Sequence, residues 1–219
     1  MNHTAYVQLL DVACGAFLLA GVLVLWRRDL AAIVRLFALQ GGALALLIAV
    51  LGVHEGDAGV VALAAGIGVL RAAVLPWLLR RAMTAGGPGR ETRPLVNVAA
   101  SLTVAALLGL LSYAVTRPVV RLDPTPATHA VPIALTVVLI GLFVLVTRRR
   151  ALSQIVGFLL MDNGITAVAF LTTSGVPLIV ELGVSLDVLL AVLVLQVLTA
   201  RMRAAFGDTD LDDLRELRD

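Results

Sequence analysis

The chain is divided by clusters of arginine into long apolar blocks, and this pattern constrains its fold more than any other feature. Each block is close to the length of about 20 apolar residues that a helix needs to cross a bilayer. Only helices fit, because isolated strands cannot satisfy their backbone groups in lipid. Of the 219 residues, 60% are hydrophobic and 15% charged, whereas soluble domains carry about 25% charged residues. The sequence therefore predicts an all-α, polytopic membrane protein.

Seven transmembrane helices are predicted from the apolar blocks. They are expected at Tyr6–Trp26, Ala31–Val53, Ala58–Leu79, Leu95–Thr116, Ala130–Thr147, Leu152–Thr173 and Pro177–Ala200. These spans form a predicted transmembrane domain over residues 1–205, and residues 206–219 form a short acidic cytoplasmic tail.

The distribution of arginine predicts the orientation of the chain, which has no lysine. Arginines cluster after the first, third, fifth and seventh predicted spans, for example in "RRD" at 27–29 and "RRR" at 148–150. Only Arg117 and Arg121 follow the spans between them. Loops rich in basic residues stay in the cytoplasm. We therefore expect a multi-pass protein of the cell inner (plasma) membrane with its N-terminus outside and its C-terminus in the cytoplasm, and no nucleic-acid partner.

Several cofactor classes do not suit this sequence. A single cysteine, Cys14, gives no set of ligands for a cluster, and His3, His54 and His129 all fall at the outer ends of predicted spans, which disfavours paired-histidine haem ligation. Retinal needs a lysine for its Schiff base, and the chain has none. We therefore expect no cofactor and no metal in this chain.

Three ionisable residues lie at similar predicted depth inside the membrane. From the rise of a helix, Asp162 lies about 18 Å from Arg150, Asp187 about 21 Å from Arg201 and Arg71 about 14 Å from Arg80. A charge at mid-bilayer costs roughly 2.5–3.5 kcal/mol on insertion scales, so such residues are few and informative. The three side chains are expected to face a shared interior and to neutralise one another.

Two interpretations of this cluster remain open. The charges could form a buried ion pair that only fixes helix packing. Alternatively, because two carboxylates face one arginine, a carboxylate without a fixed partner could take up and release protons as a relay. Glu181 lies nearer the outer surface, where it could be an exit residue or an interfacial charge. Polar amides could bridge the charges or join helices, namely Gln40, Gln154, Asn163 and Gln196.

The C-terminal part of the chain resembles a known family. The stretch "RRRALSQIVGFLLMDNGITAVAF" followed by "GVPLIVELGVSLDVLLAVLVL" is similar to hydrogenase-4 component E. That family is related to the K subunit of respiratory complex I and to the C subunit of multisubunit sodium/proton antiporters. The span with Arg71 and "PWLLRR" also fits. The resemblance is close over residues 148–219 and loose elsewhere.

The resemblance implies a proton path through this chain. In the K subunit, two glutamates on adjacent helices form part of a hydrophilic axis, and Asp162 and Asp187 match their positions, with Asp162 standing where glutamate is usual. Glu181 belongs to the component E pattern, and Arg71 falls where the family carries a basic residue. The implied partners are other membrane subunits, including antiporter-like ones, and peripheral redox subunits that carry out the catalysis.

The expected function is therefore a non-redox, membrane-arm subunit of a hydrogenase-like or complex I-like, redox-driven ion pump. A stand-alone secondary transporter is one alternative, although such proteins usually show internal repeats and none is evident here. A purely structural assembly subunit is the other. The sequence does not distinguish H⁺ from Na⁺.

Overall fold

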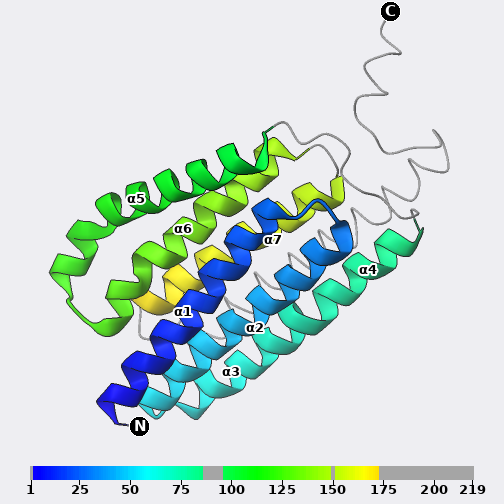
Figure 1. The fold of residues 1–219 in the computed structure, drawn as a ribbon. Coiled ribbons are helices and arrows are strands. Elements are labelled where there is room, and N and C mark those ends of the chain that lie inside the picture. Colours follow the sequence, from blue (N-terminus) through cyan, green and yellow to red (C-terminus); the bar gives the residue numbers. More distant parts are fainter. Residues whose placement is uncertain (1, 86–95, 149–150, 173–219) are drawn as a thin grey trace, which may run out of the picture.

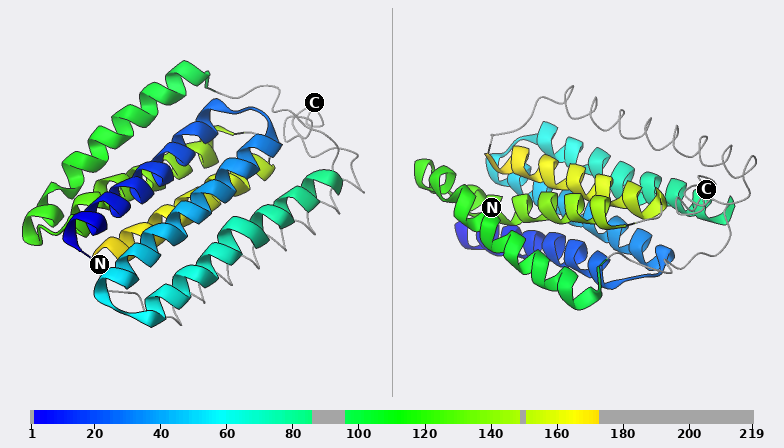
Figure 2. Two further views of the ribbon diagram at one scale, coloured as in Figure 1. Left: turned by 60° about the horizontal axis from the view of Figure 1, so that its bottom comes forward. Right: turned by 90° about the horizontal axis from the view of Figure 1, so that it is seen from above.

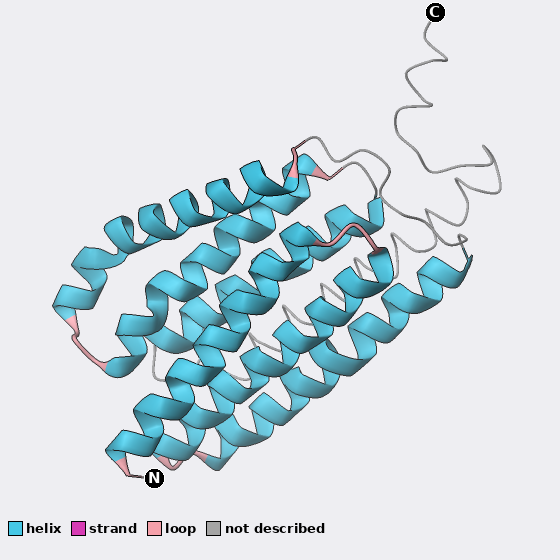
Figure 3. Cartoon of the chain, in the orientation of Figure 1, coloured by secondary structure: helices cyan, strands magenta, loops and turns pink. Residues whose placement is uncertain are grey.

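In a computed structural model, the chain is described over residues 2–85, 96–148 and 151–172, and this part contains helices and short loops without strands (Figure 3). The helices are α1 His3–Trp26, α2 Leu30–Glu55, α3 Ala58–Gly68, the π-helix η1 Val69–Val74, α4 Leu75–Ala85, α5 Val98–Leu122, α6 Pro126–Thr147 and α7 Ala151–Thr172. The segments α3, η1 and α4 follow one another without a break and form one membrane-crossing rod.

Six helices in the described residues are long and apolar enough to cross a membrane, and they coincide with the first six predicted spans. The seventh predicted span, at 177–200, and the tail at 206–219 lie outside the described residues. The all-α, multi-pass prediction is confirmed for the part of the chain that the structure describes.

The connection expected at 117–129 is mostly helical, which corrects the predicted boundaries. Helix α5 continues through Pro118 to Leu122, and α6 already begins at Pro126. The predicted span ended at Thr116, where the apolar block gives way to Arg117 and Pro118. Here the proline sits in the last turns of α5, on an exposed face, where the missing backbone bond interrupts little of the helix.

Short polar side chains fix where most helices begin. The side chains of Asn2, Asp29, Asp57, Asn97 and Thr125 accept hydrogen bonds from backbone N–H groups in the first turns of α1, α2, α3, α5 and α6. These N–H groups have no partner within the helix, and a capping side chain supplies one. The turn between α2 and α3 is completed by Gly56, whose φ of 74° suits glycine.

The helices form a bundle with unequal positions (Figures 1 and 2). Helix α5 stands at one edge and the α3–η1–α4 rod at the opposite edge, with α1, α2, α6 and α7 between them. Helix α7 packs mainly on α6 and also on α2. In the spanning windows, 67% of α7 but only 17% of α5 is buried. Helix α7 is therefore the most enclosed of the described spans.

Glycines bring the backbones of α6 and α7 into contact. A Cβ atom on Gly157 would lie 2.6 Å from the backbone nitrogen of Leu145, and one on Gly164 would lie 2.7 Å from that of Val138. Gly141 meets the backbone of Met161 even more closely. Small residues allow such close approach between membrane helices, where apolar burial gives no drive for association. The backbone of α7 beside Asp162 is thus held directly against α6.

One basic residue from the "RRR" cluster is part of the fold. Arg148 is buried and donates through Nη2 to the backbone carbonyls of Val24, Leu25 and Arg27 at the end of α1. These carbonyls have no partner within α1, and a cation suits the negative end of a helix. The predicted topological signal therefore includes a residue that joins α6 to α1.

Candidate functional site

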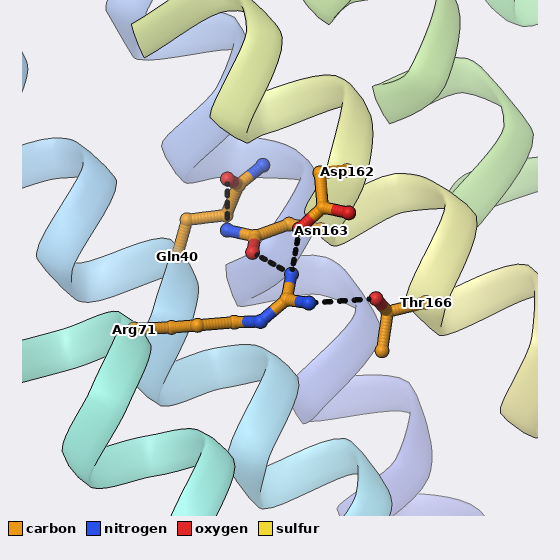
Figure 4. A network of polar contacts seen from close by, with 5 residues as sticks. All are labelled: Gln40, Arg71, Asp162, Asn163 and Thr166. Atoms are coloured by element: carbon orange, nitrogen blue, oxygen red, sulfur yellow. Dashed lines mark hydrogen bonds and ion pairs between the residues drawn. The ribbon is translucent and has the colours of Figure 1, made fainter. Parts of the chain in front are cut away.

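A buried ion pair joins the rod to α7 at the middle of the bundle (Figure 4). The Nη1 atom of Arg71 lies 2.7 Å from Oδ2 of Asp162, and their side chains are 2% and 11% exposed. The two residues come from η1 and from the centre of α7, and their contact agrees with the similar depth predicted for them. Asp187, the third residue of that prediction, lies outside the described residues. Each charge offsets the desolvation of the other, although the pair need not add net stability.

Two further side chains of α7 bind the same guanidinium. The Nη1 atom of Arg71 also donates to Oδ1 of Asn163, and Nη2 donates to Oγ1 of Thr166 over 3.0 Å. Residues 162 and 166 are four apart and therefore lie on one face of α7. Figure 4 shows the arginine side chain extended from its own helix toward these three partners. One turn of α7 thus presents an anion, an amide and a hydroxyl to a single cation.

The network continues to α2 through a second amide. Asn163 donates from Nδ2 to Oε1 of Gln40 over 3.1 Å, and both residues are buried. Arginine has only donors, so the carbonyl of Asn163 must face Arg71 and its NH₂ group must point away. Gln40 must then present its own carbonyl to Asn163. The charge of Arg71 thereby fixes the direction of both hydrogen bonds in the series from Arg71 through Asn163 to Gln40.

The backbone around Arg71 is unusual in two ways. Residues 69–74 form a π-helix, a turn that is rare and occurs frequently at functional sites. On the facing helix, a Cβ atom on Gly41 would lie 2.7 Å from both the backbone carbon and the oxygen of Arg71. Glycine therefore allows α2 to touch η1 at the residue that carries the charge. The position of the guanidinium depends on this contact as well as on its hydrogen bonds.

The structure places some of the predicted polar residues in this network and others elsewhere. Arg71, Asp162, Gln40 and Asn163 meet at its centre. Gln154 lies apart from it and donates to the backbone carbonyl of Arg148. Three predicted residues lie outside the described part of the chain, namely Glu181, Asp187 and Gln196.

Sequence reasoning missed Thr166, the hydroxyl partner of Arg71. Its spacing of four residues from Asp162 was the available signal, because that spacing places both on one helix face. Threonines are common in membrane helices, where they also bond to their own backbone, so residue type alone did not mark it.

The side chains of this site are suited to holding buried charge. Among the described residues, no group of three or more histidine, cysteine, aspartate or glutamate side chains is placed to hold a metal ion. A carboxylate, a guanidinium, two amides and a hydroxyl can stabilise a buried charge. The carboxylate of Asp162 can also exchange a proton when its contact with Arg71 is broken.

Comparison with known proteins gives one relative over the whole chain. This chain is 55% identical over 220 residues to the Mycobacterium tuberculosis protein called "Uncharacterized protein Rv0085", and the alignment covers 100% of both chains. No family model and no solved structure matches the chain.

A second similarity covers about half of the chain. Over 115 residues this chain is 35% identical to hydrogenase-4 component E of Escherichia coli K12, and the same values hold for the protein of that name from Shigella flexneri. The alignment covers 52% of this chain and 53% of the relative. This partial match supports the resemblance read from the C-terminal motifs. Relations to the complex I K subunit and the antiporter C subunit have no match of their own.

Proposed function

This chain belongs to the family of the mycobacterial protein Rv0085, and we propose that it is a membrane-embedded subunit of a hydrogenase-type oxidoreductase complex. The partial similarity to hydrogenase-4 component E and the six apolar spans support this role. Redox catalysis would belong to peripheral partner subunits, and antiporter-like membrane subunits would be neighbours in the bilayer. The chain itself would contribute no catalytic residue.

The finer proposal is that the chain takes part in proton translocation through Asp162 and Arg71. The observation that supports it most directly is the ion pair that the two residues form in the middle of the membrane region. When a proton binds to Oδ2 of Asp162, an O–H bond forms and the carboxylate loses its charge, so its attraction for Arg71 falls. The guanidinium can then move toward another acceptor, and loss of the proton restores the pair. Asp187 and Glu181 are the proposed further acids of this path.

A purely structural role is the second candidate, and a specific observation favours it. Arg71 has three side-chain partners on one turn of α7, which is the arrangement expected of a residue that ties the rod to that helix. Removing one member of such a pair leaves an uncompensated buried charge, at a cost of about 3–5 kcal/mol. The two candidates therefore differ in what neutralising Asp162 does.

Three substitutions of Asp162 separate the candidates when subunit abundance and proton pumping are measured together in membrane vesicles. If Asp162 carries protons, Asp162→Asn leaves abundance near normal and abolishes pumping, and Asp162→Glu retains both. Asp162→Ala lowers abundance as well, because it leaves a cavity and unpaired donors. Asp187→Asn should behave like Asp162→Asn.

The opposite outcome would establish the structural role. In that case Asp162→Asn lowers abundance, because the amide strands the cation, and the complexes that remain pump at the normal rate. Asp11→Asn is the matched control, because it makes the same chemical change at an exposed position of α1, away from the network. Normal pumping and normal abundance in both the Asp162→Asn and Asp187→Asn variants would refute the proton path.

The proposed setting is the inner (plasma) membrane, with the N-terminus outside and the C-terminus in the cytoplasm. Arg27 and Arg28 follow the end of α1, and Arg80 and Arg81 lie in the second half of α4. Helices α1 and α4 end on the same side of the bundle (Figure 1), which supports this orientation. A reporter fused after Asp219 should be active only in its cytoplasmic form, and activity of an external reporter there would reverse the assignment.

A further inference from the structure

A cavity of about 250 Å³ lies at the end of the bundle remote from the arginine-rich connections. It is formed where α1 and α6 begin and α2 and α7 end. Its titratable side chains come from three places: His3 and Tyr6 from α1, His54 and Glu55 from α2, and Asp123 from the turn before α6. All except Tyr6 are exposed. The cavity is thus lined by exposed acids and imidazoles.

The aromatic groups of this cavity are organised by contact. The rings of Tyr6 and His54 stack with centroids 3.7 Å apart and an angle of 9° between their planes, and His3 lies 6.4 Å from Tyr6. Tyr6 belongs to the apolar core, so the stack holds His54 at the boundary between core and solvent. Histidine is the side chain that exchanges protons with water most readily near neutral pH.

Helix α7 connects this cavity with the buried ion pair. Asp162, Thr166 and Phe170 are spaced by four residues and therefore share a face of α7. Thr166 binds Arg71, and Phe170 lines the cavity. From the rise of a helix, Asp162 and Phe170 are about 12 Å apart along the axis. Along α7, the buried apolar residues Ala167 and Phe170 lie between the polar network and the open part of the cavity.

We propose that this cavity is a proton-exchange vestibule, in which His54, with Glu55 and His3 beside it, transfers protons between the path at Asp162 and the aqueous phase outside. The inference rests on the proposed function. In each transfer, an N–H bond forms on the His54 imidazole as an O–H bond of a hydronium ion breaks, or the reverse, so atoms and charge balance and no electrons are exchanged. Tyr6 is a positioning residue that orients His54 through the ring stack.

The test uses inverted membrane vesicles that contain the whole complex, in which this end of the bundle faces the lumen. Pumping is driven by the complex's own electron donor and followed as charge translocation with a potential-sensitive dye, so that lumenal buffering does not alter the signal. The variant is His54→Phe, which retains a ring to stack on Tyr6 but carries no exchangeable proton. His129→Phe is the matched control, because His129 is exposed on α6 and does not line the cavity.

With little buffer in the lumen, His54→Phe should slow pumping per assembled complex by roughly tenfold. This is less than the roughly 10²–10⁴-fold that a general acid–base group contributes to a reaction rate. A small mobile buffer enclosed in the lumen should restore the rate, because it replaces the lost imidazole, and Glu55→Gln should show a smaller loss with the same recovery. The control His129→Phe should match the unaltered protein at every buffer concentration.

Two results would overturn the vestibule. One is a normal rate for His54→Phe at low buffer, and the other is a loss that added buffer does not restore, which would indicate a structural defect. Failure of the proposed function is recognised separately. It would appear as normal pumping in Asp162→Asn, a variant outside the cavity whose result does not depend on lumenal buffer.

Discussion

Helices α5 and α7 are both apolar enough to cross a membrane, but they differ in what their side chains do. Helix α7 is enclosed by α6 and α2 and carries Asp162, Asn163 and Thr166 on its inner surface. Helix α5 packs on α6 and α1 at the edge of the bundle and exposes large apolar side chains. Those that are exposed include Leu107, Leu110, Leu111, Tyr113, Val115 and Val119.

The two helices differ in position: α7 is enclosed by its neighbours, whereas α5 is a boundary helix at the edge of the bundle. Lipid solvates leucine as well as another helix does, so apolarity alone gives α7 no reason to be central. What α7 has in addition is the glycine contact with α6 and the polar contact with Arg71. Matched substitutions at the contacts that α7 and α5 make therefore measure what each contact contributes.

The largest difference is expected between two arginines. Arg71→Ala strands the carboxylate of Asp162 in the core and should destabilise the protein by about 3–5 kcal/mol. Arg117→Ala, on α5, removes an exposed guanidinium that lies 5.6 Å from the Tyr113 ring and should cost about 0.5–1 kcal/mol at most. Thermal unfolding of the detergent-solubilised complex measures both effects. Equal losses would mean that the buried network is no more important than a surface contact.

The second difference is expected between two glycines at helix contacts: Gly141, on α6 facing α7, and Gly109, on α5 facing α6. Gly141→Ala drives a methyl group into the backbone of Met161, and because backbone cannot turn aside as a side chain can, the cost should be about 3 kcal/mol. Gly109→Ala on α5 places its methyl group 3.7 Å from the Thr136 side chain, an ordinary contact, and should be nearly neutral. The same unfolding measurement would contradict the packing argument if Gly141→Ala were harmless.

The smallest difference is expected between two leucines. Leu160 on α7 is fully buried, and Leu160→Ala should cost about 2 kcal/mol through the cavity it leaves. Leu110 on α5 is 66% exposed, and Leu110→Ala should leave the stability of the chain unchanged. Co-purification of partner subunits sharpens the comparison. If Leu110→Ala reduces it, the exposed face of α5 is a subunit interface, and if not, the face contacts lipid.

Much of the bundle could be predicted from the sequence. Span length and composition gave the first six helices, with the boundary error at Pro118, because crossing a bilayer requires a long apolar helix wherever it lies in the fold. The depth of Asp162 and Arg71 also followed, because helical rise converts residue number into distance along the membrane normal. The expected pairing of these two residues is present in the structure.

Other features required the tertiary structure. The part played by Thr166, the π-helix at Arg71 and the contact between Gly41 and η1 depend on which helix faces are adjacent. Lipid-facing and buried faces are both apolar in a membrane helix, so the hydrophobic pattern that orients a soluble helix gives little guidance. The cavity around His54 likewise joins residues from the beginning, the middle and the later part of the described chain.

The sequence by itself thus determined that this chain is a helical membrane protein with charges buried at mid-depth, because the cost of exposing polar groups to lipid acts on every residue locally. Only the tertiary structure decided that Arg71 binds one turn of α7 and that Gln40 and Asn163 take fixed directions beside it. Those outcomes depend on close contact between backbones at particular glycines, and local composition does not encode which helices will meet there.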